Sequence, residues 1–199
     1  MLRKTSKFFL LAILVGSAVF FARGGVGFAQ DGGEVTKENW RQHPKIKEVR
    51  AVYQEVKAGL SRRSLARKRR MFEYCEPYAD TVRAIATDAK GRVRFYQTEG
   101  GSDDSSLTFE HYYDEAGRLR FVFITGGAVS GSKLEHRIYF DADGKRIWEE
   151  HSATAPGYTW PEVWPEEQLQ TSDPGTKFAS DSPCPEVKGG ARGRRRARS

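Results

Sequence analysis

A short turn phrase occurs three times in the middle of the chain and constrains its fold more than any other feature. Each copy reads Asp-x-x-Gly followed by a basic residue, and the three glycines are 26 and 27 residues apart. Aspartate at the first position and glycine at the fourth fit a type I turn with a left-handed glycine and a G1 bulge. The phrase therefore predicts three tight β-hairpins. The copies are Asp88–Arg92, Asp114–Arg118 and Asp141–Lys145.

The turns are flanked by runs rich in β-branched and aromatic residues, and an aromatic stands four residues after each glycine: Phe95, Phe121 and Trp148. Consecutive strands with short connections pair as an antiparallel meander. We therefore expect a six-stranded antiparallel β-meander over residues 81–151. The expected strands are 81–87, 92–98, 106–113, 118–125, 133–140 and 145–151.

This turn geometry assigns one face of the sheet to the core. Pairing Asp114 with Arg118 places His111 opposite Phe121, with both side chains on the face that an N-terminal helix should cover. The other face mixes aromatic residues with arginines, so it is a candidate binding surface. The candidate binding residues are Tyr96, Tyr112, Arg120, Arg137 and Tyr139.

The segment before the sheet has helical periodicity. Pro44 suits the first position of a helix, and apolar residues then recur at intervals of three and four up to Leu60. Arg62–Arg70 holds six basic residues in nine and is interpreted as a solvated helix face, with a patch for polyanions or acidic surfaces as the alternative. The predicted fold is α+β, with a helical region over 36–72 packed on the meander.

Residues 1–29 have the layout of a secretory signal peptide. A positively charged start precedes Phe8–Ala22, an apolar run of fifteen residues without charge, and the small residues Gly27 and Ala29 precede the expected cleavage. The run is short for a membrane span, which needs roughly 20 apolar residues, so cleavage is favoured. An uncleaved anchor is the alternative, because Arg23 stands before the proposed cleavage site. No transmembrane span is expected after cleavage. The mature protein is predicted to be secreted or periplasmic, with a flexible N-terminus over 30–35.

The basic charge of the chain is concentrated at its ends. Ten of its 33 basic residues lie in 1–29 and 188–199, which contain no acid, so the remainder has 23 basic and 26 acidic residues and a net charge of −3. The overall charge therefore does not indicate a nucleic-acid-binding class, and no specific nucleic acid is expected as a partner. Residues 188–199 are predicted to be a disordered basic tail and a candidate for contact with anionic surfaces.

The two cysteines, Cys75 and Cys184, are expected to form a disulfide in an exported chain, with free thiols or intermolecular pairing as alternatives. A bridge would pin the irregular extension 152–187, in which Trp160-Pro161 and Trp164-Pro165 repeat after four residues. This extension is expected to dock on its own domain. The alternative is a ligand for a groove that binds polyproline II helices.

No catalytic constellation is evident in the sequence. None of the four histidines has metal-ligand spacing, no Gly-x-Ser-x-Gly elbow occurs, and Asp141–Gly144 lacks the spacing of a calcium loop. His111 and His136 could serve a hydrolase together with a carboxylate, whereas the simpler interpretation places both in the core. We predict no catalytic residue, metal or cofactor, and the sequence favours a non-enzymatic protein without deciding the question.

The segment Tyr-Asp-x-x-Gly-Arg-Leu, from Tyr113 to Leu119, and the similar Phe140–Lys145 resemble the YD-type hairpin repeats of bacterial surface and Rhs proteins. Such repeats come in long arrays that build a shell. Three copies behind a helix depart from that pattern, so neither shell formation nor toxin encapsulation is carried over. The function expected is an exported binding or envelope-associated protein of unknown ligand. The alternatives are the hydrolase and a structural or inhibitory partner of another envelope protein.

Overall fold

The computed structural model describes residues 33–76, 80–154, 158–171 and 173–187, which belong to the compact unit Gly32–Ser199. The predicted signal peptide and the basic tail lie outside the described residues. None of the described helices is long and apolar enough to cross a membrane. The elements are α1 (Pro44–Ser61), β1 (Ala66–Met71), β2 (Asp80–Thr87), β3 (Val93–Gly101), β4 (Ser105–Tyr113), β5 (Leu119–Ala128), β6 (Lys133–Phe140), β7 (Arg146–Thr154), α2 (Glu166–Leu169) and α3 (Pro174–Ala179).

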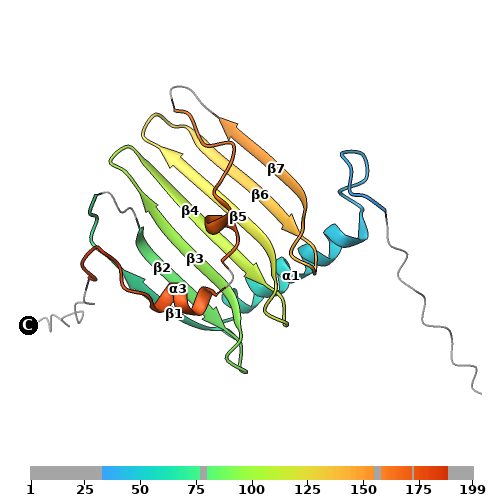
Figure 1. Ribbon diagram of the computed structural model, residues 1–199, viewed down its shortest axis with the longest axis horizontal. Coiled ribbons are helices and arrows are strands. Elements are labelled where there is room, and N and C mark those ends of the chain that lie inside the picture. Colours follow the sequence, from blue (N-terminus) through green and yellow to red (C-terminus); the bar gives the residue numbers. More distant parts are fainter. Residues whose placement is uncertain (1–32, 77–79, 155–157, 172, 188–199) are drawn as a thin grey trace, which may run out of the picture. The chain divides into compact units, whose positions relative to one another are not determined.

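In the described part of the chain, seven strands form one antiparallel sheet in chain order, with α1 on one face and the C-terminal segment on the other (Figure 1). The α+β class and the antiparallel meander are confirmed, but the prediction of six strands is wrong. The additional strand is β1, which lies within the run interpreted as a solvated helix face. The helical region predicted over 36–72 is shorter and contains one helix among the described residues, because residues 37–42 form turns and α1 ends at Ser61.

The chain turns back after α1 and pairs β1 with β2 from Ala66 opposite Thr87 to Met71 opposite Val82. Arg63 adopts a left-handed backbone with φ of 58° at this turn. Charged side chains are typical of an edge strand, because they discourage the addition of another strand. Since almost every residue of β1 is solvated, the sequence lacks the apolar alternation that would have distinguished this strand from a helix.

The three predicted turns are present, and Gly91, Gly117 and Gly144 all have positive φ. Besides the predicted G1 bulge at the glycine, each hairpin has a second bulge three residues after the glycine, which was not predicted. In the middle hairpin, Tyr113 pairs with Leu119 but Tyr112 pairs with Phe121, which leaves one extra residue between them. An extra residue reverses the faces of all that follow. The three extra residues are Arg94, Arg120 and Ile147.

The bulge corrects the predicted faces of the sheet. Phe121 lies on the α1 face with Tyr112 and Tyr139, whereas His111 lies on the opposite face. The α1 face forms an aromatic core over which the stripe of α1 packs, and Val35, from the N-terminus expected to be flexible, packs against it. The fully buried residues of that stripe are Ile46, Val49 and Val56.

Two of the bulge residues are buried arginines that tie the sheet to α1. Each donates its Nε to the carbonyl of the last strand residue before the following turn, and a terminal nitrogen to a glutamate of α1. A buried guanidinium needs such partners, because leaving its donors unpaired is costly. Arg94 bonds Tyr113 and Glu55 (3.1 and 3.0 Å), and Arg120 bonds Phe140 and Glu48 (3.3 and 3.5 Å).

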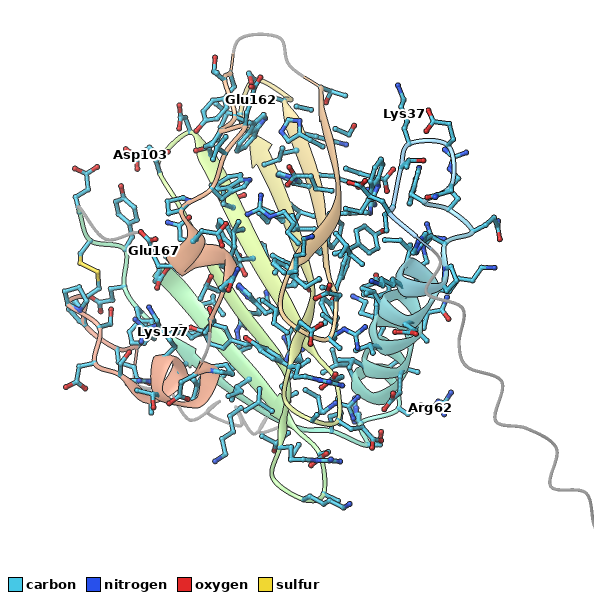
Figure 2. All side chains as sticks on the ribbon, turned by 45° about the vertical axis from the view of Figure 1, so that its right-hand side comes forward. Lys37, Arg62, Asp103, Glu162, Glu167 and Lys177 are labelled. Carbon is cyan, nitrogen blue, oxygen red and sulfur yellow. A yellow bond between two sulfur atoms is a disulfide. The ribbon has the colours of Figure 1, made fainter. Side chains whose placement is uncertain are left out.

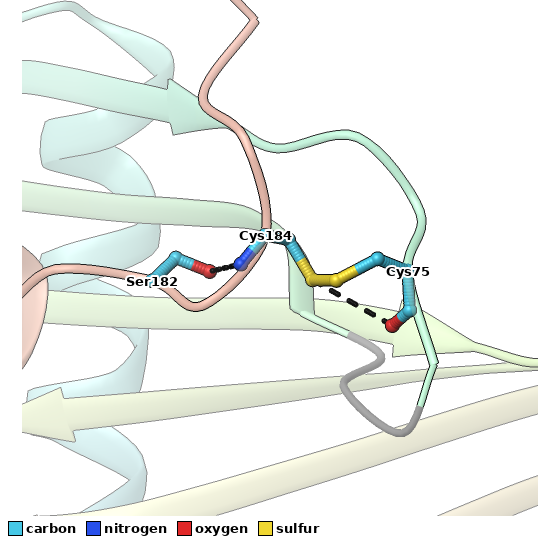
Figure 3. The surroundings of a disulfide bond; sticks show 3 residues. All are labelled: Cys75, Ser182 and Cys184. Carbon is cyan, nitrogen blue, oxygen red and sulfur yellow. Dashed lines mark hydrogen bonds between the residues drawn. A yellow bond between two sulfur atoms is a disulfide. The ribbon is translucent and has the colours of Figure 1, made fainter.

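The expected disulfide between Cys75 and Cys184 is present, with the two Cα atoms 5.7 Å apart (Figure 3). It joins the segment after β1 to the C-terminal end of the described chain. Beyond it, the Val187 N–H donates to the Met71 carbonyl at 2.8 Å. The C-terminal extension therefore ends beside β1, the strand at the opposite edge of the sheet from β7.

Candidate ligand-binding groove

Two tryptophans hold residues 158–171, here called the strap, on the sheet face opposite α1. Trp160 donates its indole N–H to Ser132 Oγ at 2.7 Å, and Trp164 donates to His136 Nδ1 at 3.0 Å. Both tryptophans are almost fully buried. The two tryptophans are four residues apart, and so are their acceptors, Ser132 and His136.

Three further hydrogen bonds fasten the strap along its length. All three involve a side chain of β4, and two of the acceptors are main-chain carbonyls of the strap. Both ends of the strap are therefore fastened to β4, whereas Trp160 and Trp164 reach Ser132 and β6. The bonds join Tyr158 Oη to Ser105 Oγ (2.8 Å), His111 Nε2 to the Gln168 carbonyl (2.8 Å) and Tyr113 Oη to the Thr171 carbonyl (3.0 Å).

A groove of about 760 Å³ opens beside the strap, over β3 and β4. One wall is the strap and the other is formed by β2 and α3; Figure 2 labels Glu167 and Lys177, one from each wall. A volume of this size over a largely apolar floor with a few polar groups is typical of small-molecule sites. The floor consists of Tyr96, Thr98, Leu107, Phe109 and His111.

His111 is a neutral, buried histidine at the groove floor, 2% exposed. Burial lowers the pKa of His111 to about 4, although the main chains of Gln168 and Tyr96 favour the charged ring. Since neutral His111 can donate Nε2–H to Gln168, its Nδ1 is then an acceptor. Nδ1 has no hydrogen-bond partner of good geometry among the described residues, so the nearby Tyr96 main chain does not satisfy it.

The charged groups of the groove differ in their burial and in their hydrogen bonds to the protein. Arg83 is 8% exposed and donates to the carbonyls of Lys177 and Ser180, at 3.1 and 2.8 Å, while Asp80 lies 3.6 Å from its Nε. Its positive charge therefore holds α3 against β2. The side chains of Lys177 and Glu167 are exposed at the rim. A ligand in the groove would meet these two charges first.

The predicted binding residues do not form one exposed surface. Tyr96 is buried in the groove floor, whereas Tyr112, Arg120 and Tyr139 are buried under α1. Only Arg137 is half-exposed, on the α1 face, where its guanidinium lies over the Phe123 ring. The assumption of a shared face fails because the second bulge was not anticipated and because α1 covers the face it was thought to leave open.

The two candidate histidines do not converge either. His111 lies on β4 and His136 on β6, with β5 between them. Burial lowers the pKa of His136, whose Nδ1 accepts from Trp164 and whose Nε2 lies 3.3 Å from Glu149. Among the described residues, no three His, Cys, Asp or Glu side chains are grouped to hold a metal.

The groove residues that the sequence analysis missed were visible as a pattern. Leu107 and Phe109 alternate with polar residues on β4 and were assigned to the face under the helix, whereas they form the floor beneath the strap. Apolar residues on both faces of the same strands indicate that the sheet is covered twice. That pattern predicts a second covering layer but not the gap within it.

Comparison of the chain with protein-family models, with curated protein sequences and with solved structures finds no match. The resemblance to YD-type repeats therefore stays a prediction. The groove has to be interpreted from its own residues.

Proposed function

We propose that this protein is an exported, non-enzymatic binding protein that holds an elongated amphipathic small molecule in the groove beside the strap. The observation that carries the proposal is the groove itself, with an aromatic and aliphatic floor and two exposed charges at its rim. Apolar floor area favours binding by about 25 cal/mol for each Å² removed from water. Polar groups at the rim would fix the orientation of the ligand.

The floor supports a ligand with an apolar body. Leu107 and Phe109 lie below such a body, and the Trp164 ring, which meets Phe109 edge-on at a centroid distance of 5.2 Å, bounds it on one side. Lys177 at the rim suits an anionic end group. His111 Nδ1 offers a buried acceptor for a ligand donor if the floor relaxes on binding.

Binding rather than catalysis is favoured by the state of the titratable groups. Burial raises the pKa of Tyr96 to about 12 and lowers that of His111 to about 4, so both are neutral at pH 7. A general base works best with a pKa near the operating pH, and neither group meets that condition. The export part of the proposal is supported by the signal-peptide layout and the disulfide.

The proposal can be tested with 1-anilinonaphthalene-8-sulfonate, which has an apolar aromatic body and one anionic group. We expect saturable binding to one site with an increase in dye fluorescence. Thr98→Phe, on the groove floor, should weaken binding at least tenfold by filling the site. Thr108→Phe is the matched control, because Thr108 lies on the neighbouring strand but faces the α1 side of the sheet. Binding that does not saturate, or that survives Thr98→Phe unchanged, would overturn the proposal.

A further inference from the structure

The end of the described chain lies beside a basic segment that is more than 100 residues away in the sequence. This basic segment runs from the end of α1 through β1. Glu186 forms a β-bridge with Phe72, and Val187 donates to Met71, so the described chain ends beside β1. The disulfide fixes this arrangement covalently.

Most basic residues of this segment have no acidic partner among the described residues. Arg70 is the exception, because it forms a salt bridge of 2.8 Å with Glu186 and donates to carbonyls near α3. The others form no ion pair with any described residue, and the one side-chain contact among them is Arg67 to the neutral amide of Gln97. The exposed basic residues are Arg62, Arg63, Arg67, Lys68 and Arg69, here called the basic edge.

The sequence after Val187 adds six basic residues and no acid. The basic edge contrasts with the net charge of −3 that the chain has without residues 1–29 and 188–199. The acids nearest in sequence to β1 are Glu73 and Glu76, which follow its far end. Two apolar side chains beside the basic edge, Met71 and Val187, are 44% and 42% exposed.

We propose that the basic edge, together with the exposed Met71 and Val187, is a docking surface for a bilayer rich in anionic phospholipid. Clustered Lys and Arg attract the negative surface potential of such a bilayer, and exposed apolar side chains can enter its interface. A single-stranded nucleic acid is less well matched, because its sites combine basic grooves with aromatic side chains that stack on bases. The proposal goes beyond ligand binding in the groove and does not depend on it.

The test uses residues 30–199, which contain the whole compact unit, and vesicles of phosphatidylglycerol and phosphatidylcholine in equal parts. We expect sedimentation with these vesicles at low salt, release above roughly 0.5 M salt because of screening, and little binding to pure phosphatidylcholine. Each basic residue near an anionic surface contributes about 1 kcal/mol, or about fivefold in partitioning. The quadruple variant Arg62→Gln, Arg63→Gln, Lys68→Gln and Arg69→Gln should therefore lose on the order of 100-fold or more.

A matched control removes four exposed lysines elsewhere: Lys37→Gln, Lys47→Gln, Lys133→Gln and Lys145→Gln. Its net charge equals that of the first variant, so it should lose less than about threefold if position matters. Circular dichroism checks that both variants are folded. Equal losses in the two variants, or no preference for anionic vesicles, would overturn the proposal. Tight binding to a poly(dT) oligonucleotide without vesicle binding would overturn it in favour of a nucleic-acid partner.

Discussion

The two faces of the sheet are covered in different ways. On the α1 face, a regular helix packs its apolar stripe on Phe95, Phe121 and other ring side chains, so that most of the contact is between hydrocarbon surfaces. On the opposite face, the strap packs Trp160, Trp164 and Leu169 into a second apolar cluster on β5 and β6, and both indoles also donate hydrogen bonds to polar atoms of the β5–β6 region. The α1 face therefore depends on packed volume, whereas the strap face combines packed volume with a few specific polar contacts.

This difference has a functional consequence. The α1 face is covered by one long helix, with a cavity of about 320 Å³ beside it, whereas the opposite face is covered by two separate segments, the strap and α3. The larger groove, of about 760 Å³, lies between these two segments. The comparison predicts that truncations in the aromatic core under α1 cost more stability than truncations in the groove floor, and that ligands bind on the strap face.

The largest effect is expected from cavity formation under α1. Phe121→Ala removes a ring that contacts Tyr53, Tyr112 and Tyr139, and we expect a loss of about 3–5 kcal/mol in the free energy of unfolding, measured with urea. Phe109→Ala, on the half-exposed groove floor, should cost only roughly 1–2 kcal/mol, because less buried surface is lost. Equal losses would contradict this difference between the aromatic core under α1 and the groove floor.

The disulfide should come next. Replacing Cys75 and Cys184 together by serine opens a loop closed over 109 residues, and we expect a loss of about 2–4 kcal/mol. Hydrogen exchange should show the loss locally as well: amides of residues 173–187 should lose more protection than those of α1. Equal loss of protection in both regions would show that the disulfide does not act through the C-terminal extension.

Acid should weaken the strap face through His111. A histidine whose folded pKa lies near 4, below its ordinary value of 6.5, leaves stability intact above pH 6.5 and removes it as the pH falls towards 4. At pH 5 the loss amounts to about 2 kcal/mol relative to pH 7. His111→Gln should reduce this pH dependence in urea unfolding without abolishing it, because burial also lowers the pKa of His136. An unchanged pH dependence in His111→Gln would contradict the assignment to His111.

The smallest effects concern single anchors of the strap. Trp164→Phe retains most of the ring but removes the donor to His136 Nδ1, and we expect a cost of about 1–2 kcal/mol in unfolding free energy. Trp160→Phe should cost a similar amount, because Ser132 Oγ loses its donor. If the strap acts as one unit, the double variant should cost less than the sum of the two, which a double-mutant cycle would measure.

Features that are specified by residues close together in the sequence could be predicted, whereas features that depend on distant segments could not. The turns were predictable because aspartate and glycine specify them within five residues, and α1 because its stripe has a helical period. β1 was not predicted, because its exposed basic residues show no alternation of apolar and polar side chains. The second bulge was missed because Arg94, Arg120 and Ile147 share no composition that indicates a bulge. The groove was missed because its walls come from separate segments whose spacing is decided only when strap and α3 have docked.

The bulge residues also indicate where the series of hairpins stops. Arg94 and Arg120 each bond a carbonyl in the hairpin that follows, at Tyr113 and Phe140. In the last hairpin the equivalent position is Ile147, and among the described residues no further strand lies beside β7. The bulge position thus carries an arginine where another hairpin follows and an aliphatic residue at the sheet edge. A design that extends this sheet by another hairpin would therefore place an arginine at position 147.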